Sequence, residues 1–123
     1  MIKNYFIVDK DERLESIIQK IVLNAHRAVL VIERKKVIGL ISEGDILKSL
    51  VYKKNMNATA STIMNKSFKF LLKKDMTLAK KMFQRYLCSF IPIVNSKMEL
   101  KDLITLEQLL SKSEMVLREG KIN

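Results

Sequence analysis

The sequence predicts a mixed α/β (α+β) fold, built from two tandem β-α-β-β-α repeats that pack as a pseudo-two-fold pair. Two observations indicate this. Apolar strand-like and amphipathic helix-like segments occur twice in the same order. In each copy an apolar strand leads into a helix through a hydroxyl residue, Ser42 in the first copy and Thr105 in the second. Each half alone is too short to bury a good core, so the halves should pack against each other.

The first repeat begins with an expected strand at residues 5–8, and Asp9 or Asp11 can cap the helix that follows. The apolar face of that helix consists of residues at helical spacing: Leu14, Ile17, Ile18, Ile21, Val22 and Ala25. Two strands, at 29–32 and 37–41, flank a polar hairpin turn at 33–36. A second helix is expected over about 43–52.

The second repeat follows the same order. Its first strand is expected at 68–72, and Asp75 is the expected cap of the next helix. The apolar face of that helix consists of Ala79, Met82, Phe83, Tyr86 and Leu87. Strands at 91–94 and 100–104 flank a turn, and the last helix begins near Leu106. The predicted boundaries are 1–57 for the first repeat, 58–113 for the second and 114–123 for a C-terminal tail.

The composition is that of an ordered globular chain, with 48% hydrophobic residues, one proline and three glycines among 123 residues. No apolar run approaches the roughly 20 residues that cross a bilayer, and the charged N-terminal region is no secretory signal. The single cysteine, Cys88, excludes an internal disulfide and suits a reducing compartment. We therefore expect a cytoplasmic location.

The formal net charge is +10, which favours attraction to anions such as nucleotides, nucleic acids or acidic proteins. The charge does not choose among these partners. The lysines are scattered along the chain instead of forming one block, and a lysine-rich genome would produce the same excess.

Three short motifs occur in a fixed order: Gly39-Leu40-Ile41-Ser42-x-x-Asp45, Ser61-Thr62-Ile63-Met64-Asn65 and Ile91-Pro92-Ile93-Val94-Asn95. With these motifs, residues 5–113 resemble a tandem pair of cystathionine β-synthase (CBS) domains, also called a Bateman module. The resemblance implies a regulatory module that binds AMP, ADP, ATP or an adenosyl compound such as S-adenosylmethionine. It implies that Asp45 contacts the ribose hydroxyls and Ser42 a phosphate. Backbone groups of the first strand and of the next would flank the base, at Phe6, Ile7, Val8, Ala28 and Val29.

The residues themselves support an anion site at this point. The backbone N–H groups of Glu43, Gly44 and Asp45 begin a helix, where the positive end of the helix dipole attracts anions. Gly39 and Gly44 would let a ligand approach the backbone. The alternative is a capping box, in which the hydroxyl and the carboxylate each accept a backbone N–H at about 1 kcal/mol. The two roles are compatible.

The second copy departs from this pattern. Thr105-x-x-Gln108 also reads as a capping box, but Gln108 offers one neutral acceptor oxygen in place of a carboxylate. Asp102 stands where the first copy has Gly39. The sequence therefore predicts one competent nucleotide site, in the first repeat, and a degenerate second site at Thr105 and Gln108.

No catalytic machinery is visible in the sequence. His26 has no cluster of metal ligands around it, Cys88 has no neighbouring base, and no P-loop or Rossmann glycine pattern occurs. We therefore expect no metal and no enzyme, but a module that modulates an enzyme or transporter, as a partner or fused. The alternatives are a basic module for nucleic acid or an acidic partner, and a ligand-free dimerisation unit.

Apolar side chains over 14–25 and 47–51 predict a homodimer. Neither membrane insertion nor specific nucleic-acid binding is expected.

Overall fold

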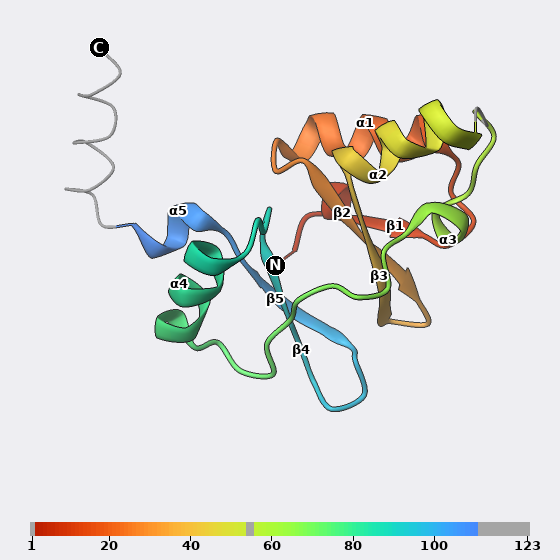
Figure 1. Ribbon diagram of the computed structural model, residues 1–123. Helices are drawn as coiled ribbons and strands as arrows, with labels where there is room; N and C mark the ends of the chain where they lie inside the picture. Colours follow the sequence, from red (N-terminus) through yellow and green to blue (C-terminus); the bar gives the residue numbers. More distant parts are fainter. Residues whose placement is uncertain (1, 54–55, 111–123) are drawn as a thin grey trace, which may run out of the picture.

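The computed structural model describes residues 2–53 and 56–110. In the first repeat, a 3-10 turn, η1 (Asn4–Phe6), leads into a three-stranded sheet of order β1-β2-β3, made of β1 (Ile7–Asp9), β2 (Ala28–Glu33) and β3 (Lys36–Ser42). β1 runs parallel to β2, and β2 antiparallel to β3. Helices α1 (Leu14–Asn24) and α2 (Glu43–Lys48) lie on one face of this sheet (Figure 1). A π-helical segment, η2 (Ser49–Lys53), continues α2.

Strand β2 is the centre of the molecule because both of its faces are buried. Its side chains alternate between the faces, as the pleat of a strand requires. On one face Val29 and Val31 pack in a cluster with Leu14, Ile17 and Ile21 of α1. On the other face the cluster joins the two repeats: Phe6, Ala28, Leu30 and Val37 with Phe90, Val94 and Leu103. The expected packing of the two halves on each other is therefore confirmed.

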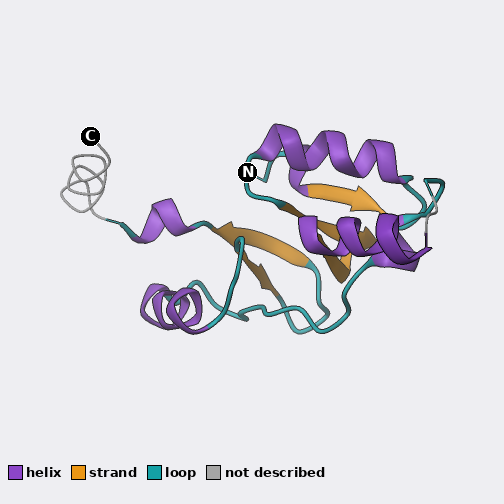
Figure 2. Cartoon of the chain, turned by 45° about the horizontal axis from the view of Figure 1, so that its top comes forward, coloured by secondary structure: helices purple, strands orange, loops and turns teal. Residues whose placement is uncertain are grey.

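The second repeat has a two-stranded antiparallel sheet, β4 (Ile91–Val94) and β5 (Leu100–Ile104), with helices α4 (Met76–Arg85) and α5 (Leu106–Leu109) (Figure 2). The strand expected at 68–72 does not form. Only Leu71 pairs, in a parallel bridge with Ile93. Leu71 is buried, but Phe70 and Leu72 beside it are exposed, so too little of this segment is held against the sheet.

The segment between the repeats contains a short helix, α3 (Ala60–Ile63), and then runs along β3. Leu40 and Asn65 exchange two backbone hydrogen bonds of 3.0 and 2.8 Å. The linker thereby adds a bridge to the outer edge of β3, which brings the second repeat close to the end of that strand.

Several local expectations were wrong. Helix α1 has Arg13 at its N-cap, and neither Asp9 nor Asp11 caps it; the Asp9 carboxylate instead accepts the backbone N–H of Asp11. Asp75 does cap α4, by accepting the N–H of Leu78 at 3.0 Å. That helix ends at Arg85, so its expected apolar face loses Tyr86 and Leu87, and Leu87 is fully exposed.

The apolar face of α1 is also narrower than expected. Val22 is 73% exposed, and Ala25 lies beyond the helix in the left-handed conformation. The predicted end of the second repeat at 113 and the tail at 114–123 fall outside the described residues. Across 2–53 and 56–110, no helix is both long and apolar enough to cross a membrane.

Candidate functional site

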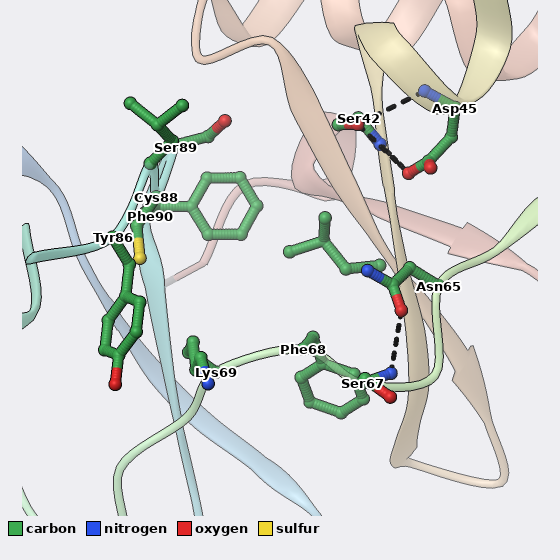
Figure 3. Close-up of a pocket in the computed structure, with 12 residues that line it drawn as sticks. Ser42, Asp45, Asn65, Ser67, Phe68, Lys69, Tyr86, Cys88, Ser89 and Phe90 are labelled. Carbon is green, nitrogen blue, oxygen red and sulfur yellow. Dashed lines mark hydrogen bonds between the residues drawn. The ribbon is translucent and has the colours of Figure 1, made fainter. Parts of the chain in front are cut away.

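Ser42 and Asp45 lie where β3 passes into α2, and they form a complete capping box (Figure 3). The Ser42 Oγ accepts the Asp45 N–H at 3.3 Å. Asp45 Oδ2 accepts the backbone N–H of Ser42 at 2.9 Å and its hydroxyl at 3.0 Å. The capping interpretation is therefore confirmed. All of these contacts to the carboxylate use Oδ2, so within the described residues the other oxygen, Oδ1, remains available to a ligand.

Two of the three backbone N–H groups expected to point outward at the start of α2 are hydrogen-bonded within the chain instead. Of the three N–H groups that should have pointed outward, Glu43 donates to the carbonyl of Arg27 at 3.1 Å and Asp45 donates to Ser42. Helix α2 itself spans only Glu43–Lys48. Gly44 alone of these three keeps an N–H outside these contacts.

The two glycines also differ from expectation. A Cβ at Gly39 would come within 2.6 to 2.9 Å of three atoms of Met64, so the close approach that Gly39 permits is that of the linker and not of a ligand. A Cβ at Gly44 would meet only Ser42 Oγ, at an ordinary 3.6 Å.

A pocket of about 240 Å³ opens beside the capping box, with walls from three parts of the chain (Figure 3). The first repeat contributes Leu40, Ser42 and Asp45. The linker and the loop before β4 complete it with Asn65, Ser67, Phe68, Lys69, Tyr86, Leu87, Cys88, Ser89 and Phe90. Because the walls come from both repeats, the pocket exists only when the repeats are packed together.

The pocket combines one carboxylate, several neutral polar groups and aromatic side chains. Its one lining cation is Lys69, whose Nζ lies 4.4 Å from the centre of the Tyr86 ring. Asn65 holds the linker in shape, because its Oδ1 accepts the backbone N–H of Ser67 at 2.8 Å. Phe90 is buried and stacks edge-on against Phe6 of the first repeat, with ring centres 5.5 Å apart. Such a site can accept hydrogen bonds from hydroxyls and hold a flat ring and one anionic group.

Of the eight predicted ligand-binding residues, only Ser42 and Asp45 line this pocket; the other six, Glu43, Gly44, Ile7, Val8, Ala28 and Val29, do not. Val8, Ala28 and Val29 are fully buried in β1 and β2. Ile7 and Val8 line a different hollow, with Asp9 and Lys20 among its walls. The strand order keeps Ile7 and Val8 away, because β2 lies between β1 and β3. Ala28 and Val29 pair with Ser42 and Ile41, but their side chains are fully buried in the core.

Sequence reasoning missed the residues at 65–69 and 86–90. The expected packing of the two repeats on each other was the signal that could have identified these wall residues. If the first sheet packs on the second repeat, the loop before the strand at 91–94 must lie beside the end of the first repeat's motif.

The second repeat has a hollow of its own, of about 590 Å³, at the start of α5; we call it the second hollow. It is lined by Ala25, His26, Arg27, Leu87, Cys88, Ser89, Leu106 and Glu107. The two predicted residues of the degenerate site are not among these. Thr105 is the N-cap of α5 but makes no side-chain cap, and Gln108 is exposed, so the second capping box is wrong.

The loop that enters this second hollow is fixed by Asn24, a buried polar residue. Its Nδ2 donates to the carbonyls of Tyr5 at 2.9 Å and Ala28 at 2.8 Å, and its Oδ1 accepts the His26 N–H at 2.7 Å. His26 lies with Nδ1 2.6 Å from the Asn24 carbonyl and Nε2 3.3 Å from Glu107 Oε2. Both neighbours are hydrogen-bond acceptors, so the ring nitrogen that makes each contact must carry the proton.

One thiol is shared by the pocket and the second hollow. Cys88 lines both of them, but burial raises the pKa of its thiol, which opposes formation of the nucleophilic thiolate. Within the described part of the chain, no group of three or more His, Cys, Asp or Glu side chains could hold a metal ion.

Comparison with known proteins bears on the fold. Residues 1–52 match the family model of the CBS domain. No curated protein matches the chain. Among solved structures, a CBS domain protein from Pyrobaculum aerophilum complexed with AMP superposes with a TM-score of 0.74 at 15% identity, over 98% of this chain and 95% of that one.

Two further structures are similar. A CBS domain pair/ACT domain protein from Thermotoga maritima gives a TM-score of 0.71 at 15% identity, covering 97% of this chain and 93% of that one. A protein from Methanocaldococcus jannaschii, described as a putative archaeal homologue of γ-AMPK, gives 0.75 at 18% identity, over 86% of this chain and 45% of that one. The chain therefore has the fold of a CBS domain pair, and the resemblance seen in its motifs is confirmed.

Proposed function

We propose that the chain is a regulatory module that binds an adenine nucleotide in the pocket beside Ser42 and Asp45. The observation that carries this proposal is the position of the Asp45 carboxylate, which lines an inter-repeat pocket while its Oδ1 stays outside the capping box. A carboxylate oxygen there can accept hydrogen bonds from vicinal ribose hydroxyls. Structures of the same fold complexed with AMP support the choice of ligand class.

Lys69 is the proposed main partner of the ligand phosphate, in place of the larger role expected for Ser42. The Ser42 hydroxyl donates to Asp45 and accepts from its N–H, which leaves it little capacity for a phosphate. Lys69 is exposed and is the one cation among the pocket-lining residues. A single cation favours AMP over ADP and ATP, because each further phosphate adds negative charge that nothing lining the pocket neutralises.

The proposal keeps one competent site and no catalysis. The second hollow already places Glu107, a carboxylate, opposite His26, and Thr105 and Gln108 supply no charged acceptor to it. The module would act by changing an enzyme or transporter, as a separate partner or within a longer chain, in the cytoplasm. S-adenosylmethionine is the other ligand to compare, since it shares the adenosine group but carries no phosphate.

Thermal unfolding with AMP, ADP, ATP and S-adenosylmethionine tests the site. A ligand at a hundredfold excess over its dissociation constant adds about 2.7 kcal/mol to the free energy of unfolding. For a chain of this size that corresponds to a rise in Tm on the order of 10 °C. We expect AMP to produce such a shift, Asp45→Ala to remove most of it, and Gln108→Ala to keep it.

Asp75→Ala is the matched control for Asp45→Ala. Both variants lose a helix-capping carboxylate, which costs about 1 kcal/mol of basal stability, but Asp75 is not among the residues of the pocket. Asp75→Ala should therefore lower the basal Tm and keep the AMP shift. Equal loss of the shift in both variants, or an unchanged shift in Asp45→Ala, would mean that Asp45 is only a cap.

A further inference from the structure

The turns of the two β-hairpins are hydrogen-bonded to each other, far along the strands from the nucleotide pocket. The Val37 N–H donates to the Met98 carbonyl at 2.8 Å, and the Leu100 N–H donates to the Lys35 carbonyl at 3.3 Å. β3 begins at this end, with Lys36, and finishes at the pocket with Ser42. Figure 1 shows both turns on the side of the sheet away from α1 and α2. These hydrogen bonds hold two turns from different repeats together as one platform.

Five exposed cations occupy this platform, which we call the hairpin-tip surface: Arg34, Lys35, Lys36, Lys97 and Lys101. Within the described residues none of them takes part in an ion pair. Two of the carboxylates nearby, Glu33 and Glu99, already have partners. Glu33 pairs with Lys10 at 2.6 Å, and Glu99 accepts from Asn95 Nδ2 at 2.8 Å. That hydrogen bond, with the field of Lys101, Lys97 and Lys35, holds the pKa of Glu99 below its ordinary value.

The backbone of the first turn is unfavourable for the residues that it carries. Arg34 and Lys35 have φ of 51° and 71°, a left-handed conformation that a residue with a Cβ adopts at a cost. Two successive residues of this kind define the hairpin turn for which Asn-Gly is the preferred pair. The chain places two cations where local preference favours two small neutral residues.

An apolar hollow of about 240 Å³ lies beside the cations. Lys35 and Lys101 stand at its rim with Glu99, and its remaining walls are aliphatic: Ile2, Ile7, Ile32 and Leu100. A neighbouring hollow shares Ile7 and Ile32 and is lined by Arg34, with the carboxylates Asp9 and Glu12 among its other walls. The surface thus offers positive charge next to room for an apolar side chain.

We propose that the hairpin-tip surface binds an acidic segment of a partner protein, with carboxylates against the cations and an apolar side chain in the hollow. Charge complementarity selects an anionic partner. A protein segment fits better than a nucleic acid, because single-stranded nucleic acids stack their bases on aromatic side chains and the residues lining this hollow include none. The site is separate from the proposed nucleotide pocket, and both can be occupied together.

Fluorescence anisotropy with a labelled glutamate-rich peptide that contains leucine tests the proposal, at about 0.15 M salt, where weak long-range attraction is screened. The variant is Arg34→Asn/Lys35→Gly, which removes two charges and installs the pair that the turn prefers, so the fold is retained. Lys80→Gln/Lys81→Gln on α4 is the control, because both lysines are exposed and the loss of net charge is the same. We expect the hairpin variant to weaken binding about three- to tenfold, as the loss of two exposed ion pairs implies, and the control less than twofold.

Two further measurements test the apolar contact of the peptide and the independence of the two sites. Replacing the leucines of the peptide by serine should weaken binding, and Asp45→Ala in the protein should leave it unchanged. Equal weakening by the hairpin variant and the α4 control would show attraction to net charge alone and overturn the proposal. Tighter binding of a DNA duplex than of the peptide, lost in the hairpin variant, would overturn it in favour of nucleic acid.

Discussion

Met64 occupies the space that a side chain at position 39 would need. Its Sδ lies 2.6 Å from the position of a Cβ built on Gly39, and its own Cβ lies 2.9 Å away. The glycine of the first motif is thus explained by packing between β3 and the linker, which also pairs Asn65 with Leu40. This contact positions Asn65 and the residues after it as a wall of the pocket.

Gly39→Ala should therefore destabilise the chain. Overpacking of this kind typically costs about 1–3 kcal/mol. Because the Met64 Cβ cannot rotate away, the backbone of the linker would have to shift. Gly44→Ala is the control, since a Cβ there is unhindered and a helix favours alanine over glycine by up to about 1 kcal/mol. Denaturant unfolding should show opposite changes in the two variants. Equal stability of both would remove the proposed reason for Gly39.

Asn24 should be the costliest polar residue to remove from the first repeat. It is buried, and its amide satisfies the carbonyls of Tyr5 and Ala28 and the N–H of His26. Asn24→Ala leaves these groups without partners, at about 1–3 kcal/mol for each one that stays buried. Gln19→Ala, at an exposed position of the same helix, should change stability by less than about 0.5 kcal/mol. Denaturant unfolding compares the two, and a loss in Asn24→Ala no larger than that in Gln19→Ala would show that the buried hydrogen bonds of Asn24 add little stability.

The sequence predicted the elements better than the site, and the reason is physical. Apolar spacing reports which face of an element is buried, so β2, β3, β4 and β5 were placed correctly. The Ser42–Asp45 spacing defines a local contact within one turn of chain, and the capping box was found from it. The walls at 65–69 and 86–90 come from packing between the repeats, which no local spacing encodes. Thr105-x-x-Gln108 has the same spacing as the first motif, yet its box does not form, so spacing alone does not ensure a cap.

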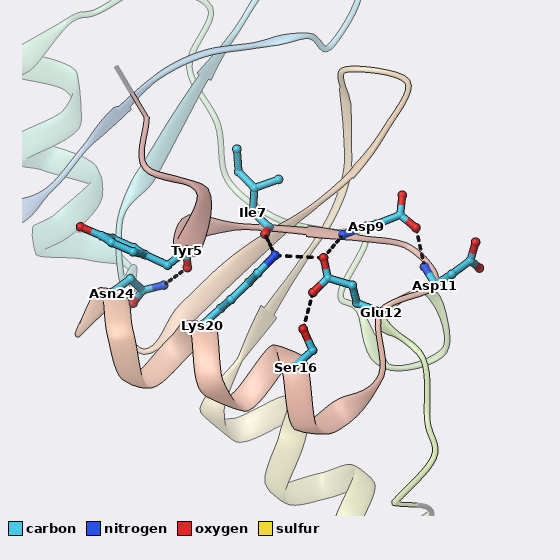
Figure 4. Close-up of polar contacts among 8 residues, drawn as sticks. All are labelled: Tyr5, Ile7, Asp9, Asp11, Glu12, Ser16, Lys20 and Asn24. Carbon is cyan, nitrogen blue, oxygen red and sulfur yellow. Dashed lines mark hydrogen bonds and ion pairs between the residues drawn. The ribbon is translucent and has the colours of Figure 1, made fainter.

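The Glu12–Lys20 pair should make the first repeat sensitive to acid. The two side chains lie 2.9 Å apart and cover the outer edge of β1, where Lys20 Nζ donates to the Ile7 carbonyl at 2.8 Å and Glu12 accepts the Asp9 N–H at 3.0 Å (Figure 4). Burial acts to raise the pKa of Glu12, but hydrogen bonds from the Asp9 N–H, Ser16 and Lys20 hold the pKa below its ordinary value. A lowered pKa in the folded state means that this stabilisation is present above the ordinary carboxyl pKa and is lost as the pH falls through the folded value.

Glu12→Gln tests this dependence. We expect the variant to be about 1 kcal/mol less stable than the parent at pH 7 and the difference to shrink as the pH falls below about 4.5. Glu15→Gln, at an exposed position of the same helix, is the control and should follow the parent at every pH. Urea unfolding at several pH values measures the difference. If the difference in free energy of unfolding between the parent and Glu12→Gln stays constant down to low pH, the stabilising role of the ionised Glu12 is contradicted.

The helix face opposite the sheet should join two copies of the chain. Exposed apolar side chains gather on α1 and on α2 with its extension, where Val22 is 73% exposed, Leu47 61% and Val51 62%. Helices α1 and α2 cover the same face of the sheet (Figure 1), so one two-fold interface can bury side chains from both. We expect light scattering at micromolar concentration to return twice the 14.3 kDa mass of the chain.

Val22→Glu/Leu47→Glu should convert this dimer to a monomer that keeps its fold, because a charge buried without a partner is strongly unfavourable at an interface. Leu72→Glu/Leu87→Glu adds the same charge at exposed apolar positions of the second repeat and should remain dimeric. Circular dichroism of each variant separates loss of the dimer from loss of the fold. A parent chain that scatters only as a 14.3 kDa species would rule out the dimer. A dimer that is lost in the second variant but kept in the first would move the interface to the second repeat.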